Sequence, residues 1–253
     1  MFIIQINQHI VEAFGFIHFL FPFDIKVPYF DTFIYYTIVR KKIQEENSMN
    51  KKLFLSSSFS DVAGLLAEFE ENLADKRVTF IPTASKVEKV TFFVKAGKKA
   101  LKKLGLIVDE LDISTASTQE IADKLIKNDI IYMTGGNTFF LLQELKRTGA
   151  DKLIKEEVLA GKLYLGESAG AVVTAPDIAY LQAMDSPKKA PDLENFQGLA
   201  LVDFSVVPHY KSMPFKKISQ QIVEEYSAKL PLKAISNKEA ILVKDGQITV
   251  RRK

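Results

Sequence analysis

Residues 166–170 carry the clearest chemical signal, because they read Gly-Glu-Ser-Ala-Gly and match the pattern G-x-S-x-G. In this pattern the glycines let a strand turn sharply into a helix, which leaves the serine hydroxyl exposed at the bend. The helix behind the serine directs free N–H groups and its positive dipole end towards developing negative charge. The pattern therefore predicts that Ser168 is a nucleophile.

A serine hydroxyl needs a base to remove its proton, and histidine is the usual base because its pKa lies near neutrality. The chain has three histidines, and His9 and His18 lie in an N-terminal stretch without clear periodicity. His209 instead follows an apolar run of β-forming residues at 204–207. We therefore expect His209 to be the base for Ser168, with a hydrogen-bonded structural histidine as the alternative.

A third group must orient the imidazole, and a carboxylate also stabilises its charged form. Enzymes with this kind of serine turn can carry the acid between the serine and the histidine in the chain. Asp185 lies in that interval, in a loop-like stretch, and we select it as the acid. Asp192 and Glu194 are kept in reserve.

Acyl transfer also needs backbone N–H groups near the nucleophile, which form an oxyanion hole. Residues 135–137 read Gly-Gly-Asn at the end of the strand expected at 129–134, which comes before the strand that leads into the serine motif. We expect the N–H groups of Gly136 and Ala169 to be the donors. The alternative is a simple turn in which Asn137 caps the next helix, and both roles are compatible.

The elements that must position these residues alternate between short β-rich runs and amphipathic helical stretches. Parallel neighbours need crossover connections, so this alternation predicts an α/β fold: a three-layer αβα sandwich with a mostly parallel central sheet. Sites in such folds lie at the carboxyl ends of the strands. We expect strands at 52–56, 77–82, 106–111, 129–134, 162–165, 204–207, 232–235, 240–243 and 247–251, with a turn at 245–246, and helices at 60–74, 90–104, 118–127, 138–147 and 151–160.

The first 48 residues are crowded with Phe, Ile and Tyr in no clear period. Glu12, Asp24, Lys26 and Asp31 interrupt them, so no run of about 20 apolar residues, the length of a membrane span, remains. The features of a secretory signal are not visible either. We interpret residues 1–48 as an N-terminal extension upstream of the true start or of the fold, with an interfacial anchor as the alternative. Residues 49–253 then form a single domain.

The composition narrows the function classes. A hydrophobic content of 47% in 253 residues is sufficient for one substantial core. The net charge of +3 is spread over scattered lysines and acids, so we expect no nucleic-acid partner. The chain contains no cysteine, which excludes disulfides and a thiolate nucleophile and fits a cytoplasmic protein. The sequence leaves a homodimer open.

Three motifs together resemble a known family: residues 134–139 (TGGNTF), 166–171 (GESAGA) and 207–210 (VPHY). Their order and spacing are similar to those of the S51 serine peptidases, the group of dipeptidase E and cyanophycinase, whose fold resembles class I glutamine amidotransferases. The resemblance covers about residues 50–250. It implies Ser168 as nucleophile, His209 as base, and Gly136 with Ala169 as the oxyanion hole, and it places the acid in the loop of Asp185.

The sequence departs from dipeptidase E in its charges. That enzyme cleaves after an N-terminal aspartate, and recognising a free carboxylate requires a cation. No arginine lies between the serine motif and the histidine, which leaves Lys188, Lys189 and Lys211 as local cations. The resemblance therefore implies hydrolysis of short peptides without a metal or organic cofactor, and this departure leaves open whether an N-terminal aspartate is required. An esterase using the same serine turn and a non-catalytic binding protein are the alternatives.

Overall fold

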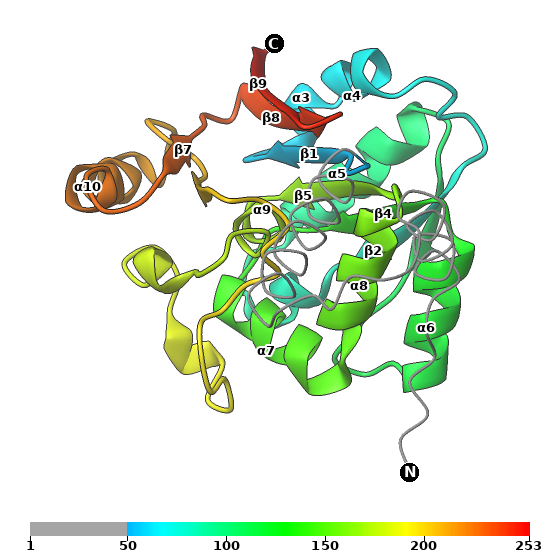
Figure 1. The fold of residues 1–253 in the computed structure, drawn as a ribbon, viewed down its shortest axis with the longest axis horizontal. Coiled ribbons are helices and arrows are strands. Elements are labelled where there is room, and N and C mark those ends of the chain that lie inside the picture. The colour runs from blue at the N-terminus through cyan, green and yellow to red at the C-terminus, as the bar shows by residue number, and fades with distance from the viewer. Residues whose placement is uncertain (1–49) are drawn as a thin grey trace, which may run out of the picture. The chain divides into compact units, whose positions relative to one another are not determined.

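The computed structural model describes residues 50–253, and the expectation for residues 1–48 lies outside that range. A seven-stranded sheet forms its centre, in the order β3-β2-β4-β5-β1-β8-β9 (Figure 1). The strands are β1 (Leu53–Ser56), β2 (Arg77–Ile81), β3 (Ile107–Glu110), β4 (Ile130–Met133), β5 (Leu163–Glu167), β8 (Glu239–Lys244) and β9 (Gln247–Arg252).

The sheet is mostly parallel, as the sequence predicted. β3, β2, β4, β5 and β1 run in one direction, and only β8 and β9 are antiparallel to their neighbours. Asp245 and Gly246 connect β8 to β9 with φ of 53° and 72°. Two consecutive positive φ angles are typical of the type I′ hairpin turn, which confirms the turn expected there.

Helices cover both faces of this sheet. α3 (Phe59–Val62), α4 (Gly64–Phe69) and α5 (Phe92–Lys103) pack on one face, while α6 (Thr118–Lys127), α7 (Thr138–Thr148) and α8 (Ala150–Leu159) pack on the other (Figure 1). The alternation of side chains along β1 shows the two layers: Phe54 belongs to one hydrophobic cluster, and Leu53 and Leu55 belong to the other. The three-layer αβα sandwich is therefore confirmed.

A small second sheet extends from this core. β6 (Ser205–Val207) and β7 (Leu232–Ala234) pair in parallel, and α10 (Lys216–Tyr226) connects them. The strands were expected, but the sequence analysis did not predict α10. Its sequence is mostly polar, and only Ser219 and Ile222 are fully buried, so its apolar stripe is narrow. The remaining short helices are η1 (Thr83–Val87), α9 (Ala169–Val172), η2 (Ala179–Leu181) and η3 (Pro187–Lys189).

The helix expected at 60–74 is wrong in its extent, because the structure has two shorter helices there that end at Phe69. Asn72 and Asp75 adopt positive φ angles of 55° and 64°. Short polar side chains tolerate this left-handed conformation, which a helix cannot include. The chain therefore leaves the helical path before residue 74.

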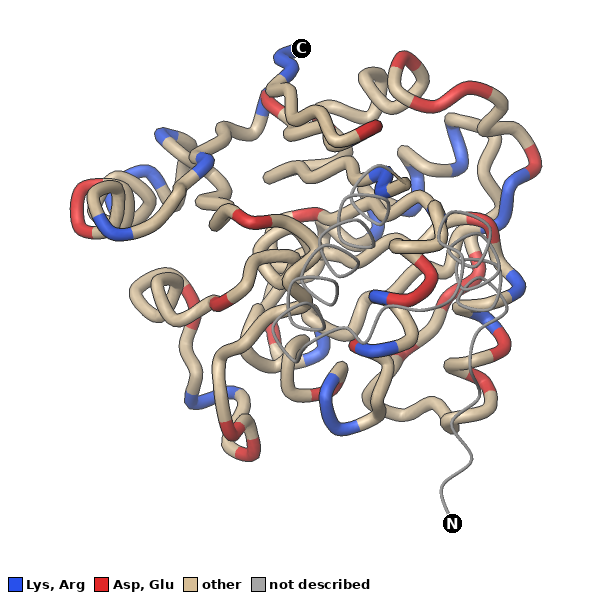
Figure 2. The backbone as a smooth tube through the Cα atoms, viewed as in Figure 1, with Lys and Arg blue, Asp and Glu red and all other residues tan. Residues whose placement is uncertain are grey.

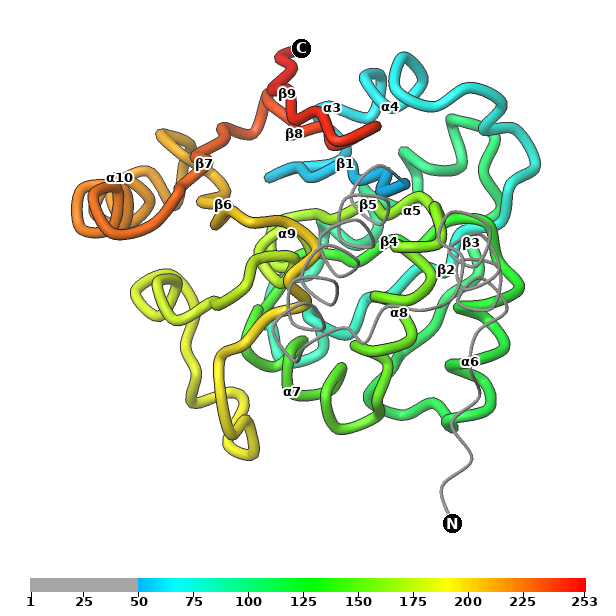
Figure 3. Tube along the Cα trace, in the orientation of Figure 1, coloured from blue at the N-terminus to red at the C-terminus, as the bar shows by residue number. Residues whose placement is uncertain are grey.

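The two ends of the described chain meet in the sheet. β1 pairs with β5 on one side and with β8 on the other, so the first strand lies beside the last hairpin (Figure 3). Lysine, arginine and acidic residues are interspersed along the described chain (Figure 2). No helix among residues 50–253 has the length and apolar character that crossing a bilayer requires.

Candidate active site

Ser168 lies at the sharp turn between β5 and α9, with φ of 49° and ψ of −106°. The glycines on either side are required because the turn leaves no room for a side chain at their positions. A Cβ at Gly166 would lie 2.6 Å from the carbonyl oxygen of Gly170, and a Cβ at Gly170 would lie 2.3 Å from that of Met133. The strained backbone and the two close approaches are what the G-x-S-x-G pattern requires of a serine held at such a turn.

The imidazole of His209 lies next to this serine. The distance from Ser168 Oγ to His209 Nε2 is 2.9 Å. His209 follows β6 and has a φ of 58°, and its backbone N–H donates to the Ser57 hydroxyl at 2.9 Å. Its ring stacks on Phe215 with centroids 4.8 Å apart. The structure thus brings together the two residues that the sequence analysis paired.

Asn237 lies on the other side of the imidazole. Its side-chain oxygen is 2.7 Å from His209 Nδ1. An amide oxygen can only accept, so Nδ1 carries the proton and Nε2 is left free to accept the proton of Ser168. Burial lowers the pKa of His209, although the hydrogen bond to Asn237 opposes this effect. The imidazole is therefore oriented by a neutral group, and its burial favours the uncharged form.

The sequence analysis missed Asn237 because it searched only for acids between the serine and the histidine. The topology gives the signal that could have found it. β6 and β7 are parallel neighbours, His209 follows the end of β6, and Asn237 follows the end of β7. Carboxyl ends of parallel strands meet at one edge, so polar residues after both strands lie close together.

Asp185 does not contact the imidazole, and its expected place beside His209 is corrected by the structure. Its Oδ2 accepts from the Thr138 backbone N–H at 2.8 Å and from the Thr138 hydroxyl at 2.5 Å. Burial raises the pKa of Asp185. The carboxylate therefore holds the start of α7. The reserve acids Asp192 and Glu194 are exposed at the surface.

The backbone N–H groups expected to form the oxyanion hole belong to Gly136 and Ala169. Ala169 is the first residue of α9, and Gly136 precedes α7 with a φ of 133°. A Cβ on Gly136 would lie 2.2 Å from the carbonyl of Ala84, and one on Gly135 would lie 3.2 Å from Ser168 Cβ. Neither the Gly136 nor the Ala169 N–H donates a hydrogen bond to another residue of the 50–253 region. Both are thus available to a ligand.

Asn137 fixes the chain directly after Gly136. Its N–H donates to the Ala84 carbonyl at 2.8 Å, and its side-chain oxygen accepts from Phe140 N–H at 2.9 Å. Its side-chain nitrogen donates to the Ser186 carbonyl at 3.1 Å. The expected helix cap is therefore present, and it holds the loop that carries Gly136.

Two exposed apolar side chains lie on segments next to the candidate site. The ring of Phe93 lies 3.7 Å from the Cβ position of Gly135. Phe92 next to it is 73% exposed, and Met213, four residues after His209, is 77% exposed. Side chains of this size are normally covered, and these two belong to segments that contact Gly135, through Phe93, and His209, through Phe215.

The local cations are partly engaged elsewhere. Lys189 forms a 2.7 Å ion pair with Glu88, and Lys211 Nζ lies 5.1 Å from the centre of the Tyr210 ring. Of these three lysines, Lys188 on the short helix η3 makes neither kind of contact with the described residues. Because no arginine lies between Ser168 and His209 in the sequence, this segment offers no arginine to bind a carboxylate.

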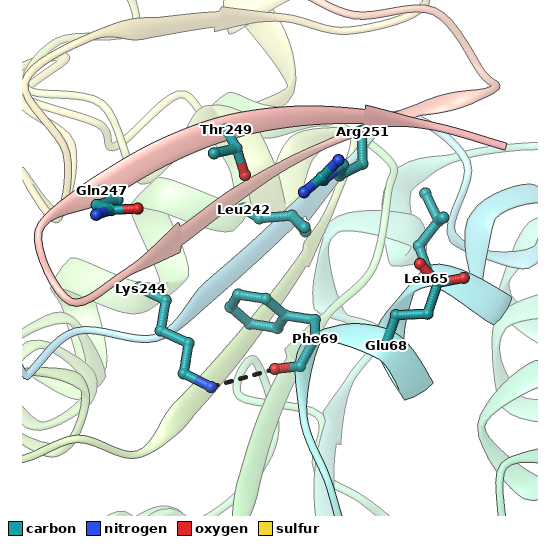
Figure 4. Close-up of a pocket in the computed structure, with 8 residues that line it drawn as sticks. All are labelled: Leu65, Glu68, Phe69, Leu242, Lys244, Gln247, Thr249 and Arg251. Carbon is teal, nitrogen blue, oxygen red and sulfur yellow. Dashed lines mark hydrogen bonds between the residues drawn. The ribbon is translucent and has the colours of Figure 1, made fainter.

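Two hollows in the described region are lined by residues other than Ser168 and His209. One of about 420 Å³ lies between α4 and the β8–β9 hairpin, where Lys244 Nζ donates to the Phe69 carbonyl at 3.4 Å (Figure 4). Another of about 440 Å³ is lined by Tyr210 and Asn237, next to the histidine. Within residues 50–253 no group of three or more His, Asp or Glu side chains is arranged to hold a metal ion.

Comparisons with known proteins show the family to which the chain belongs. The model of peptidase family S51 matches residues 52–251, and the chain belongs to this family. It is 65% identical over 201 residues to an uncharacterized peptidase of Listeria innocua, covering 79% of this chain and 96% of that protein. It is 32% identical over 171 residues to peptidase E of Haemophilus influenzae, covering 65% of this chain and 75% of that enzyme.

Solved structures show the same fold. A peptidase E-like protein from Listeria monocytogenes superimposes with a TM-score of 0.77 at 64% identity, over 80% of this chain and 98% of that chain. A peptidase from an acI-B1 actinobacterium has a TM-score of 0.60 at 21% identity, over 82% of this chain and 89% of that chain, which supports the fold alone. The protein is therefore a peptidase of family S51.

Proposed function

We propose that this protein is a serine peptidase that hydrolyses short peptides through an acyl-enzyme on Ser168, with His209 as the general base. The observation that carries the proposal is the 2.9 Å separation of Ser168 Oγ and His209 Nε2. A nucleophile and its base must lie within this range for the proton to move as the bond forms.

In the first half-reaction Ser168 Oγ attacks the peptide carbonyl carbon, and its proton passes to His209 Nε2. The carbonyl oxygen becomes an oxyanion that accepts hydrogen bonds from the Gly136 and Ala169 N–H groups. When the C–N bond breaks, Nε2 gives the proton to the leaving amine. The acyl group then remains on Ser168 as an ester.

In the second half-reaction Nε2 of His209 takes a proton from water, and the resulting hydroxide attacks the ester carbonyl. The bond to Ser168 Oγ breaks, and the proton returns from Nε2 to that oxygen. Asn237 stabilises the tautomer that both halves need, because its oxygen holds the proton on Nδ1. The cycle uses side chains, backbone and water alone.

The proposed substrates are short peptides without a required aspartate. The local lysines are partly engaged, whereas exposed Phe92 and Met213 lie on segments that contact the site. An apolar residue next to the scissile bond fits these surroundings better than a carboxylate does. We place the reaction in the cytoplasm on the absence of cysteine.

Replacement of Ser168 by Ala tests the proposal. Wild-type protein should react covalently with a fluorophosphonate and cleave members of a library of short peptides. S168A should do neither, while a control variant at the surface, Lys102→Ala, should do both. Retained hydrolysis in S168A would refute the assignment, and saturable peptide binding without release of amino acids in the wild type would indicate a binding protein.

A further inference from the structure

Ser57 directly follows β1 and has a buried hydroxyl that the reaction above does not use. The residue is 1% exposed. Its hydroxyl accepts from the His209 backbone N–H at 2.9 Å and donates to the Ile235 carbonyl at 2.9 Å. The single hydroxyl proton is therefore already bonded, and a side chain without exposed surface does not contact a substrate. Ser57 can act in the reaction only through the residues to which it is bonded.

The residue before Ser57 contacts the nucleophile. The Ser168 backbone N–H donates to the Ser56 carbonyl at 2.8 Å, directly after the parallel pairing of β1 with β5. Two consecutive residues at the carboxyl end of β1 are therefore bonded to the backbones of Ser168 and His209. The Ser56 carbonyl and the Ser57 Cα belong to one planar peptide group, so the two contacts keep a fixed relation to each other.

The backbone of His209 depends on such a contact. Its φ of 58° lies in the left-handed region, which a residue with a full side chain keeps only where its surroundings fix it. The Ile235 carbonyl also accepts from the Tyr210 N–H at 2.9 Å, so Ile235 would keep a partner without Ser57. The His209 N–H would instead lose the acceptor that it has among residues 50–253. Loss of the Ser57 hydroxyl therefore acts on His209 in particular.

We propose that Ser57 is a positioning residue that fixes the His209 backbone relative to Ser168, and so sets the 2.9 Å distance from Ser168 Oγ to His209 Nε2. This inference rests on the proposed function. The bond to Asn237 and the stacking on Phe215 orient the imidazole ring itself. The bond to Ser57 holds the backbone from which that ring extends.

Two substitutions separate this role from the general cost of losing a buried hydroxyl. S57A removes the hydroxyl of Ser57, and T79V replaces the hydroxyl of Thr79 in β2 by a methyl group. The Thr79 hydroxyl is also buried, donates to the Lys124 carbonyl at 2.8 Å and accepts from the Asn128 side-chain nitrogen at 2.9 Å. Each variant thus lacks one donor and one acceptor, and T79V is the matched control.

The readout is the reaction of Ser168 with a fluorophosphonate, in which the Oγ–P bond forms, fluoride leaves and the serine proton passes to His209 Nε2. S57A should lower the rate constant of inactivation about 10- to 100-fold, with the apparent binding constant unchanged, since a displacement of about 1 Å costs up to about 10²-fold. T79V should react within about threefold of the wild-type rate, because its partners belong to other segments.

A second comparison tests whether the effect passes through the imidazole. In H209A there is no base to position, so the double variant S57A/H209A should react within about twofold of H209A. Groups that act as one unit show this lack of additivity. A general effect of Ser57 on the fold would instead lower the rate by the same factor whether or not His209 is present.

Three results would overturn the inference: a wild-type rate in folded S57A, an equal loss in T79V, or the same loss from S57A with and without His209. Where S57A does not fold, Ser57→Cys takes its place with the same expectations, because a thiol is a weak donor and acceptor. Where H209A reacts too slowly to measure, the comparison of S57A with T79V decides.

Failure of the proposed function is distinguishable from failure of this inference. If the proposed function fails, the fluorophosphonate does not label the wild type and S168A retains hydrolysis, whatever the Ser57 variants do. If only the inference fails, the wild type is labelled at Ser168 and S57A is labelled at the same rate.

Discussion

The side-chain oxygen of Asn237 lies 2.7 Å from His209 Nδ1. The imidazole is therefore hydrogen-bonded to a neutral amide, which does not bring the negative charge that a carboxylate would. An amide orients the ring and selects the tautomer, but it attracts the proton of the charged imidazole only weakly. The candidate base is consequently weaker than one paired with a carboxylate.

Asn237→Asp should raise the pKa of His209 by about one unit or more, because a negative charge within hydrogen-bonding distance favours the charged imidazole. The acid limb of the profile of kcat/KM against pH should move upward by the same amount. Asn237→Leu, which has similar volume and no acceptor, should lower kcat at least about 100-fold. An unshifted acid limb in N237D would contradict the role given to Asn237.

In the wild type, the acid limb of kcat/KM should be centred below pH 6.5. Burial lowers the pKa of His209 from that value, and the imidazole must be neutral to accept the serine proton. Below the lowered pKa, activity should fall about tenfold per pH unit. A profile recorded from pH 4.5 to 9 checks this, and an acid limb centred above pH 6.5 would be inconsistent with it.

Asp185→Asn should leave the pH profile unchanged and keep kcat within about fivefold. The new side chain still offers an oxygen to the Thr138 N–H and hydroxyl, and burial already raises the pKa of Asp185. Asp185→Ala should lower the free energy of unfolding by about 1–3 kcal/mol, because the two donors lose their partner. A loss of activity in D185N equal to that of His209→Ala would restore Asp185 as the acid.

Gly170→Ala should prevent folding or destabilise the protein by several kcal/mol, about 3 or more, because its Cβ would lie 2.3 Å from the Met133 carbonyl oxygen. The control is Gly64→Ala in α4, whose Cβ meets nothing within 4 Å. That change should raise the free energy of unfolding by up to about 1 kcal/mol. Urea unfolding of both variants compares them, and equal stabilities would contradict the close approach at Gly170.

The stability of the wild type should depend on pH through Glu167. Burial raises its pKa to about 7, although donors that include Tyr132 and the Phe59 N–H oppose this effect. Between its ordinary pKa of 4.5 and about 7 the folded state holds a proton that the unfolded state has lost. The stabilisation is therefore complete below pH 4.5 and is lost as pH rises through 7, about 3 kcal/mol in all.

E167Q has no ionisable group at this position, so its free energy of unfolding should lack the pH dependence that comes from Glu167. Urea unfolding at pH 4.5 and pH 8 measures the stability difference between wild type and E167Q at each pH. That difference should change by about 3 kcal/mol in favour of E167Q at the higher pH. An unchanged difference would mean that Glu167 is already ionised at pH 4.5 in the folded protein.

Local patterns were sufficient to predict most of the sheet and the two central residues of the candidate site. The turn around Ser168 is encoded within five residues, and His209 is the single histidine after the first 48 residues. The strands β1, β2, β4 and β5 are short, buried on both faces and flanked by turn residues, which is how parallel strands appear in a sequence.

The contact of Asn237 with His209 and the burial of Glu167 could not be predicted from local patterns. Asn237 meets His209 because β6 and β7 pair across 24 intervening residues, a register that depends on tertiary packing. The sequence alone does not show whether Glu167 faces solvent or Tyr132. Its burial depends on the packing of α5 over this position, which is a tertiary contact. Helix α10 was missed because its buried stripe is too narrow to stand out from its polar residues.

The pairing of β1 with β8 has a consequence for biosynthesis. One edge of β1 stays unpaired until β8 of the last hairpin has been synthesised. Asn237 lies two residues before that hairpin begins. An unfinished copy still held on the ribosome has the reactive serine but neither the amide that aligns its base nor the strand that seals the sheet. Hydrolysis of peptides should therefore appear only in completed molecules.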